Sequence, residues 1–594
     1  MRRRRAAAWC AAVLVVALPS AASAGTQLTY GDPPADAPDP DEVTVPTEPV
    51  DLGVAPLPLR IEAGERTRIE LADGRTYLDT LEVRSDPAGD QVLVNELGFD
   101  DYVAGVAEMP GRWHLEALKA QAVAARTYAW HAIELGTFER RGLGYDICDT
   151  VDCQVFRGAA QEEGRSGQRW RRAVDQTAGE VLVDDDGAPI LARYFSTSGG
   201  RTLPNEVVFP SSGPRPYLVG IDDPADEASP YHRWQVTFTR DEFEAVLGRG
   251  ERLASVVPVA EVERLGPVDD PNAQVRLTGG DGAEVVLDAV EFRRFVSEVA
   301  PQLYPDRFPS SRADGLRPLP ATMPSGRFEV TVGDDEVVVD GRGWGHAVGL
   351  GQYGALGRAE AGEAYDDILA AYYHGLRPTT SDAAPDRVRV GLSQVAVGSF
   401  RPDAPSTVRG DGEVVAEGAV GTWTVAREDG GIRLTAPPGT GDDPRVSATV
   451  PLDADRDDAA RVRAVTATPG VAHLEVTSAD GEVVATRRLG AVDAGEVAAA
   501  WDLTDDAGEP VPAGDHTVAI VVTAADGTEH GHPLPVRVER PSAVERLTGA
   551  DGDLLPLAVA GGILLLGGWL VVRIARATTR RPERGARRRP TDRS

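Results

Sequence analysis

The chain has 594 residues and a formal net charge of −32 at pH 7, with 42% hydrophobic and 26% charged residues. Its length exceeds what one hydrophobic core usually supports, so we expect about three domains. The composition is that of a folded protein and excludes global disorder. A chain this acidic repels phosphate backbones, so nucleic-acid binding is a poor candidate function.

The N-terminus has the pattern of an exported protein. Four arginines, an apolar stretch and then Ala22-Ser23-Ala24 predict a signal peptide over residues 1–24. Residues 25–55 are rich in proline and aspartate and lack periodic apolar positions, so we expect a flexible linker there. Export would leave the mature chain in an oxidising compartment.

Residues 56–378 are predicted to form one domain of mixed α and β structure. Alternating runs joined by glycine turns, such as "TRIELADG", predict strands near its start. Apolar and small residues at helical spacing predict a helix from about residue 113: Leu115, Leu118, Ala122, Ala125 and Ala129. Later runs such as "HRWQVTFT" and "YDDILAAYYHG" predict a strand and a helix respectively.

The segment around this helix holds an isolated acid and two bases. Glu108 lies before the helix, and Lys119, the single lysine of the chain, lies seven positions before Arg126. That spacing puts the two bases on one helix face, which predicts a cationic ridge for substrate hydroxyl, acetamido or carboxylate groups. The alternative for Lys119 is a surface ion pair with Glu116, three positions before it.

Two cysteines, Cys148 and Cys153, follow in the sequence "CDTVDC". In an oxidising compartment they predict a disulfide that closes a small loop beside Gln154, a candidate substrate-binding residue. A zinc site would need further ligands, and no histidine occurs between residues 132 and 231. We therefore expect no cofactor, with zinc at the two cysteines as the alternative.

Two glycine-containing segments carry polar side chains suited to a ligand. In "ARYFSTSGGRT", the hydroxyls of Ser196, Ser198 and Thr202 flank a glycine pair and are expected to bind sugar hydroxyls. The alternative is that one of these serines is a catalytic nucleophile, but the nucleophile motif Gly-x-Ser-x-Gly is absent.

The second segment, "GRGWGHAVGLGQYG", is expected to form tight turns that present four side chains for sugar recognition: Trp344, His346, Gln352 and Tyr353. His346 is either a hydrogen-bond donor in the site or a structural histidine. Residues 349–354 also satisfy G-x-G-x-x-G, but no clear strand leads into them, so a dinucleotide site is not indicated.

The sequence beyond residue 380 predicts all-β structure. Valine-rich alternation with regular glycine and aspartate turns indicates β-sandwich modules over residues 379–455 and 456–540. In the second module, Trp501-Asp502, Ala507-Gly508 and Val511-Pro512-Ala513-Gly514 resemble the immunoglobulin-like module of the flagellar hook-capping protein family. That resemblance implies an adhesive or spacing role.

The C-terminal region has the pattern of a membrane anchor. After a juxtamembrane linker over residues 541–553, the uncharged, mostly apolar residues 554–572 predict a transmembrane helix. The arginine-rich tail 573–594 is then expected in the cytoplasm. The predicted fold class is a mixed α+β central domain followed by all-β, immunoglobulin-like sandwich modules and a C-terminal transmembrane helix. The predicted location is the cell membrane, with an extracytoplasmic ectodomain.

Five segments of the central domain, in this order, resemble the SpoIID/LytB family, named after the stage II sporulation protein D and the amidase enhancer. They are "FDDYVAGVAEMPGRWHLEALKAQAVAARTYA", "YDICDTVDCQVFRG", "AVDQTAGEVLVDDDGAPILARYFSTSGGRT", "YLVGIDDP" and "GRGWGHAVGLGQYGALGRAEAGEAYDDILAAYYHGL". The resemblance implies binding of peptidoglycan glycan strands. In the sporulation branch it also implies lytic transglycosylase activity on strands stripped of stem peptides, with Glu108 as the catalytic acid.

The residues permit this chemistry. One carboxyl group first protonates the leaving glycosidic oxygen, and then accepts the proton of the muramyl C6 hydroxyl that attacks C1, giving a 1,6-anhydro ring. Ordinary glycoside hydrolases use two carboxyls, so an isolated glutamate fits the lytic scheme better. Its pKa must be raised by burial, for which Tyr102, Met109 and Trp113 are the expected wall. Alternatively, Glu108 simply caps the following helix.

The leading functional prediction is a membrane-anchored lytic transglycosylase whose partners are glycan strands and a cell-wall amidase. A second class is a non-catalytic cell-wall module that binds glycan or enhances an amidase. A third, an adhesin built from the β modules, leaves the five central segments unexplained.

Overall fold

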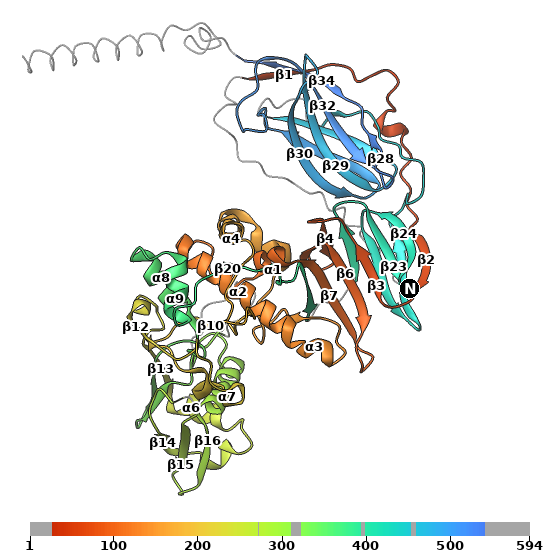
Figure 1. The fold of residues 1–594 in the computed structure, drawn as a ribbon. Coiled ribbons are helices and arrows are strands. Elements are labelled where there is room, and N and C mark those ends of the chain that lie inside the picture. Colours follow the sequence, from red (N-terminus) through yellow and green to blue (C-terminus); the bar gives the residue numbers. More distant parts are fainter. Residues whose placement is uncertain (1–25, 271, 310–321, 394–397, 453–458, 541–594) are drawn as a thin grey trace, which may run out of the picture.

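The computed structural model describes residues 26–270, 272–309, 322–393, 398–452 and 459–540 (Figure 1). The predicted signal peptide and C-terminal span lie outside these residues. Three large hydrophobic cores are present: one joins the helices to two β-sheets, one lies within residues 231–339, and one lies in the C-terminal module.

The central helix α2 (Leu115–Leu135) organises the region that holds Glu108. It begins after the N-cap His114 and ends at Gly136, whose φ of 52° is left-handed. Fully buried alanines along α2 allow neighbours to pack closely. These neighbours are α1 (Phe99–Gly105), α4 (Gly164–Gln176), α8 (Gln352–Glu360) and α9 (Tyr365–Tyr372).

An all-β unit lies beside the helices and is built from two distant parts of the chain (Figure 1). Strand β7 (Gln91–Gly98) pairs with β6 (Thr80–Ser85) and with β21 (Arg387–Leu392). One sheet has the order β24-β23-β3-β6-β7-β21-β8 and the other β2-β26-β25-β22-β4-β5. The remaining strands are β2 (Val50–Ala55), β3 (Leu59–Glu62), β4 (Arg68–Leu71), β5 (Thr76–Leu78), β8 (Ile147–Cys148), β22 (Ser399–Pro402), β23 (Ser406–Gly410), β24 (Glu413–Ala419), β25 (Trp423–Glu428) and β26 (Gly431–Ala436).

This arrangement corrects the predicted order of an α+β domain followed by β modules. Residues 387–436 do not form a module after the central domain, because they complete sheets that residues 50–98 begin. The helical region is thus an excursion between β7 and β21. Period-two alternation identifies strands but carries no information about their partners.

A separate lobe is inserted between the helices α4 and α8. Strand β18 (Glu336–Gly341) pairs with β13 (Trp234–Thr239) and β17 (Phe328–Val332). A second sheet contains β14 (Val259–Leu265), β15 (Gln274–Gly279) and β16 (Glu284–Asp288), and the lobe's helices are α6 (Arg240–Leu247) and α7 (Ala289–Leu303). Phenylalanines from both helices and sheets form its core.

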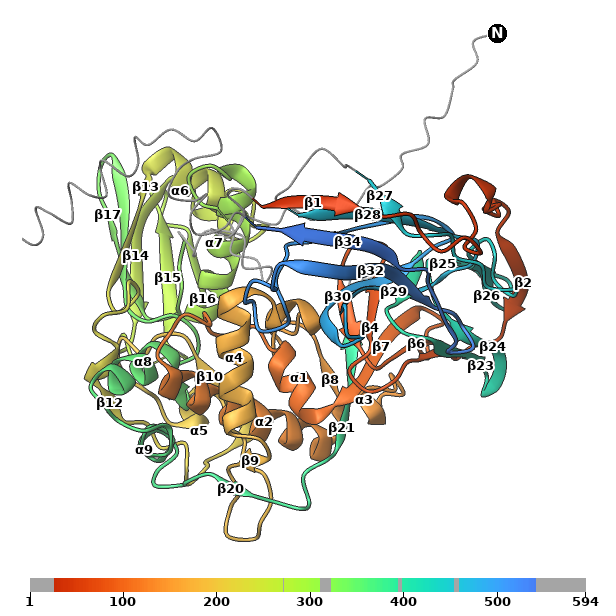
Figure 2. The same ribbon diagram turned by 90° about the horizontal axis from the view of Figure 1, so that it is seen from above.

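The C-terminal module is a two-sheet sandwich around buried Trp501. Its larger sheet has the order β1-β34-β32-β29-β30, so the N-terminal strand β1 (Gln27–Tyr30) pairs with β34 (Leu534–Glu539) (Figure 2). The other strands are β27 (Val450–Pro451), β28 (Ala460–Thr466), β29 (Gly470–Ser478), β30 (Val483–Val492), β31 (Gly495–Trp501), β32 (Gly514–Thr523) and β33 (Glu529–His530). Residues 25–55 are therefore not a free linker, since β1 and β2 each join a sheet.

The membrane part of the predicted fold class is also corrected. Within the described ranges, no helix is both long and apolar enough to cross a bilayer. The predicted span 554–572 falls outside those ranges, so the structure supplies no transmembrane helix. A single-pass membrane location is not supported.

Candidate functional site around Glu108

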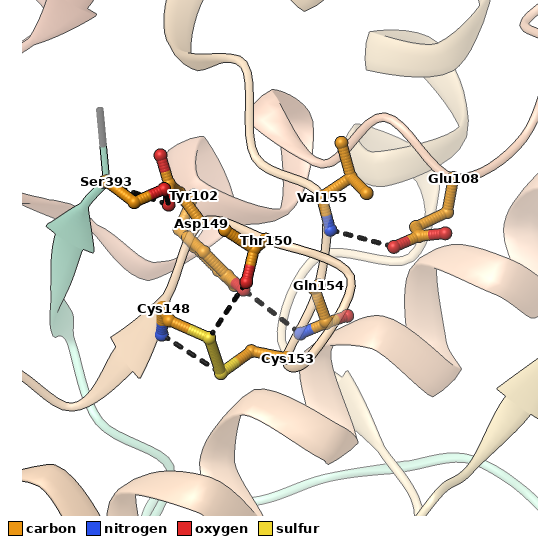
Figure 3. The surroundings of a disulfide bond; sticks show 9 residues. All are labelled: Tyr102, Glu108, Cys148, Asp149, Thr150, Cys153, Gln154, Val155 and Ser393. Atoms are coloured by element: carbon orange, nitrogen blue, oxygen red, sulfur yellow. Dashed lines mark hydrogen bonds between the residues drawn. A yellow bond between two sulfur atoms is a disulfide. The ribbon is translucent and has the colours of Figure 1, made fainter. Parts of the chain in front are cut away.

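Glu108 lies in the turn between α1 and α2 and is half-buried. Its Oε1 accepts a hydrogen bond of 2.8 Å from the backbone N–H of Val155 (Figure 3). Its carbonyl oxygen accepts one of 3.2 Å from Nε2 of Gln352. The interpretation of Glu108 as a helix cap is wrong, because the side chain that caps α2 is that of His114.

The surroundings of Glu108 favour its protonated form. Burial raises the pKa of its carboxyl group, and the contacts of Val155 and Tyr194 oppose that rise. Three tyrosines from different elements lie near it: the buried Tyr102 of α1, and the half-buried Tyr128 of α2 and Tyr194 of β10 (Tyr194–Phe195). Burial raises the pKa of each phenol, and the charge of Glu108 raises it further. Glu108 therefore keeps its proton to a higher pH than an exposed glutamate does, as a general acid requires.

Gln154 fixes the orientation of the tyrosine hydroxyl beside Glu108. Its Nε2 donates to the Tyr102 hydroxyl at 3.0 Å and to the carbonyl of Ala125 at 3.3 Å. A carbonyl can accept but not donate, so this contact sets which way the amide points. Oε1 of Gln154 must then accept the proton of Tyr194, at 2.8 Å.

The Tyr194 hydroxyl, which donates to Gln154, also lies beside Glu108. Its contact opposes the rise that burial causes in the pKa of the Glu108 carboxyl group.

The disulfide between Cys148 and Cys153 closes the loop that precedes these contacts (Figure 3). The backbone N–H of Cys148 donates to Sγ of Cys153 at 3.2 Å, and Asp149 accepts hydrogen bonds from Ser393. The closed loop leads directly into Gln154 and Val155, both of which act on the Glu108 site. In the part of the chain that the structure describes, no cluster of three or more His, Cys, Asp or Glu side chains is arranged to hold a metal.

The glycine-rich segment reaches Glu108 through a short parallel strand pair. In β19 (Leu350–Gly351), Leu350 is paired with Tyr194 and Gly351 with Phe195. A Cβ at Gly349, whose φ is 80°, would collide with the carbonyl oxygen of Arg193, so the approach requires glycine. This pairing brings Gln352 to Glu108, where its Nε2 also contacts Gln121 at 3.3 Å.

Comparisons with known proteins agree with this geometry. The SpoIID family, described as Stage II sporulation protein, matches residues 88–183, which include Glu108, Gln154 and Val155. Stage II sporulation protein D of Bacillus subtilis (strain 168) is 30% identical over 301 residues, which cover 49% of this chain and 77% of that protein. This chain belongs to the SpoIID family.

Two further similarities accompany SpoIID membership. The amidase enhancer of Bacillus subtilis (strain 168) is 31% identical over 297 residues, 46% of this chain and 39% of that protein. The FlgD Ig-like domain matches residues 447–526. The crystal structure of FlgD from Xanthomonas campestris is 28% identical, covering 18% of this chain and 77% of that chain, with a TM-score of 0.13. Both family resemblances expected from the sequence are confirmed.

Aromatic side chains of this SpoIID site form two contacting pairs. The ring of Trp113 lies 4.7 Å from that of Tyr353, and the ring of Trp344 lies 5.0 Å from that of Tyr231. Trp344 is held there by backbone hydrogen bonds to Thr197. Trp113, Tyr353 and Trp344 are half-buried, which leaves part of each ring able to contact a ligand.

His346 packs between aromatic rings and the backbone of its own segment. Its Nδ1 accepts a hydrogen bond of 3.1 Å from the backbone of Val348, and its ring lies 5.5 Å from Phe195 and 5.4 Å from Phe209. Burial and the charge of Arg193 lower its pKa to about 3. Of the two roles open to His346, this environment matches the structural one.

Two of the three hydroxyls predicted to bind sugar instead form hydrogen bonds within the protein. Oγ of Ser198 donates to Asp226 at 2.8 Å, and Oγ1 of Thr202 accepts the backbone N–H of Ile221 at 2.8 Å. Ser196 is half-buried and has its Oγ 3.3 Å from Oγ1 of Thr197. Ser196 is therefore the hydroxyl that stays available to a ligand.

Lys119 and Arg126 share a face of α2, but other parts of the chain cover it. Lys119 pairs with Glu116 at 2.8 Å and lies 5.3 Å from the ring centre of Tyr365. Arg126 is 1% exposed, binds Asp100 at 2.6 Å and donates to the carbonyl of Glu180. The cationic ridge expected from their spacing is thus absent, because Arg126 is a core residue paired with a carboxylate.

Three residues near the site were not predicted from the sequence: Tyr194, Gln121 and Tyr231. Tyr194 stands in a quoted family segment, but its role depends on the pairing of β10 with β19, which no local pattern encodes. Tyr231 and Trp344 are likewise far apart in sequence. An aromatic residue at a strand end beside a glycine-rich turn was the available signal for Tyr194.

Proposed function

We propose that this chain binds peptidoglycan glycan strands and cleaves them as a lytic transglycosylase, with Glu108 as the single acid and base. Membership of the SpoIID family and similarity to an amidase enhancer give the chain a cell-wall-related role. The observation that carries the finer proposal is one half-buried carboxyl group with a raised pKa, fixed by Val155 and facing Tyr194.

The contacts of Glu108 suit both halves of the reaction. Before cleavage, burial favours the protonated carboxyl group, which transfers its proton to the glycosidic oxygen. After transfer, the Val155 N–H stabilises the carboxylate that removes the C6 hydroxyl proton. General acid and base catalysis of this kind contributes roughly a hundredfold to ten-thousandfold in rate.

The test is digestion of peptide-free glycan by the full chain, followed by mass spectrometry of the products. We expect 1,6-anhydromuramyl ends from the parent and from Glu139→Gln, which alters an exposed glutamate. Glu108→Gln should produce none. Reducing ends would indicate a hydrolase instead, and a lack of cleavage by every preparation would refute the enzymatic proposal.

A second candidate function is enhancement of a cell-wall amidase, and the similarity to the amidase enhancer favours it. Stem-peptide release by a purified amidase would be measured with and without this chain. Under this alternative, release increases with the chain present and is unaffected by Glu108→Gln.

A further inference from the structure

Helix α4 presents a row of arginines to solvent. Arg165, Arg169 and Arg172 are spaced by four and three positions, which puts them on one face of the helix, and all three are exposed. The opposite face packs on α1 and α2 through buried side chains such as that of Trp170. The three arginines therefore belong to the surface and take no part in the core.

Arg112 extends this row toward the Glu108 site. It stands between Gly111 and Trp113, whose carbonyl oxygens accept hydrogen bonds from Nε and Nη2 of Arg169 at 3.2 and 3.0 Å. A Cβ at Gly111 would collide with the carbonyl oxygen of Ser166, so this turn lies directly against the first turn of α4. Because Arg112 is also exposed, its positive charge adds to those of the three helix arginines.

The arginine row, which consists of Arg112, Arg165, Arg169 and Arg172, has no carboxylate partner. Across the described residues, no Asp or Glu oxygen lies within ion-pair distance of its guanidinium groups. Arg171, on another side of α4, instead pairs with carboxylates at 2.5 and 2.7 Å. The arginine row is thus a local positive surface in a chain whose net charge is −32, and an external anion would be attracted to it.

The shape and composition of this face indicate a linear anion. The helical rise separates Arg165 from Arg172 by roughly 10 Å, with Arg169 between them, which suits repeated charges better than one small anion. The exposed side chains beside them, Gln168 and Gln176, are polar. A protein interface or a membrane surface would require apolar anchors on this face of α4. Nucleic-acid bases would require aromatic rings to stack on.

We propose that the arginine row binds a linear polymer of phosphodiester groups, such as an anionic polymer of the cell wall. Phosphate oxygens match the forked N–H groups of guanidinium. Arg169 holds the turn that carries Arg112, and the other three arginines supply contacts to the polymer. The row ends beside the half-buried pair Trp113 and Tyr353, so a polymer attached to glycan would lie next to the strand at the Glu108 site. This binding goes beyond the proposed function and does not require cleavage.

Binding of poly(glycerol phosphate) to the full chain tests the arginine row. One variant combines Arg165→Gln with Arg172→Gln, and its matched control combines Arg249→Gln with Arg294→Gln. The control removes the same charge from exposed arginines of the inserted lobe, which also lack a carboxylate partner within the described residues. We expect the first variant to bind about tenfold more weakly, with a shallower salt dependence, because fewer counterions are released. The control should bind as the parent does.

Thermal unfolding would verify that both variants are folded, and both should cleave polymer-free glycan as the parent does. Equal weakening in the two variants would show a long-range effect of net charge and overturn the proposal. Equally tight binding of polyglutamate, tighter binding of single-stranded DNA, or binding of phosphatidylglycerol vesicles in place of the polymer would each assign the row to another ligand and overturn it too.

The two proposals fail separately. A parent chain that does not bind poly(glycerol phosphate) would overturn the role of the arginine row and leave the proposed function intact, because that function is judged by the glycan products. A parent chain that binds the polymer through Arg165 and Arg172 but cleaves no glycan would support the row and refute the lytic activity.

Discussion

Glu108 and Asp226 are both shielded carboxyl groups of the same region, but their hydrogen bonds differ. Asp226 is fully buried and accepts from Oγ of Ser198 at 2.8 Å, from the N–H of Gly199 at 2.6 Å, and contacts His232 at 2.7 Å. Glu108 accepts one backbone hydrogen bond and is half-buried. Asp226 thus joins segments of the chain, whereas Glu108 is left able to exchange a proton.

The largest expected effects come from neutralising each carboxyl group. Glu108→Gln should reduce turnover at least a hundredfold, because the proton donor is lost. Asp226→Asn should instead lower the free energy of unfolding by roughly 1–3 kcal/mol, because an amide cannot accept all three donors. Product mass spectrometry and thermal unfolding of both variants would show the two effects. Strong destabilisation by Glu108→Gln would contradict the comparison.

The pH dependence of stability should also separate Glu108→Gln from the parent. The raised pKa of Glu108 means that its stabilising contribution is present below the unfolded pKa and is lost as pH rises through the folded pKa. At pH 4 the parent and variant should unfold at similar temperatures. At pH 8 the variant should be the more stable, because it has no buried charge, and a reversed order would show that the folded state favours the carboxylate.

A smaller effect is expected from opening the loop that supplies the Val155 hydrogen bond. Replacing both Cys148 and Cys153 by serine should cost about 2 kcal/mol of stability by the loop-entropy relation. The contact that lowers the pKa of Glu108 would be weakened, so the basic limb of the pH–rate profile should move to higher pH. Kinetics from pH 5 to pH 9 would measure this. An unchanged profile would mean that the loop keeps its shape without the disulfide.

Tyr194→Phe should shift the same limb in the same direction. The contact of the Tyr194 hydroxyl lowers the pKa of Glu108, so its loss should raise that pKa. Turnover at pH 8 should therefore fall less than turnover at pH 5. A shift of the limb to lower pH would show that the hydroxyl instead stabilises the protonated carboxyl group.

The sequence predicted the parts of this site that depend on local pattern. Leu115 and its periodic partners predicted α2, whose observed span is Leu115–Leu135, and the isolated Glu108 stood out before it. The Trp501 segment predicted the C-terminal immunoglobulin-like domain, and its family match covers residues 447–526. In each case neighbouring residues contain the whole signal.

The remaining features depend on contacts between distant segments. Tyr194 reaches its place by pairing with Leu350, and strands 387–436 share sheets with strands 50–98. The face of Lys119 and Arg126 appeared open because periodicity shows which residues share a face but not what covers it. Tyr365 and Glu180, which cover that face, come from α9 and β9 (Glu180–Val181).

The smallest effect is expected at Lys119, whose ammonium group already pairs with the carboxylate of Glu116. Burial raises the pKa of Glu116, but hydrogen bonds from Lys119 and from the N–H of Tyr365 keep it below its ordinary value. That stabilisation is present above the unfolded pKa and is lost as pH falls through the folded pKa.

Lys119→Met should therefore cost at most about 1 kcal/mol at pH 7 and less at pH 3, with turnover unchanged. Lys119→Arg should be close to neutral in both respects, since arginine can also pair with Glu116. Thermal unfolding at the two pH values and glycan cleavage at pH 7 would check both variants. A tenfold loss of turnover with an intact fold would show that the ammonium group of Lys119 acts on the substrate, and that the ion pair with Glu116 opens when glycan binds.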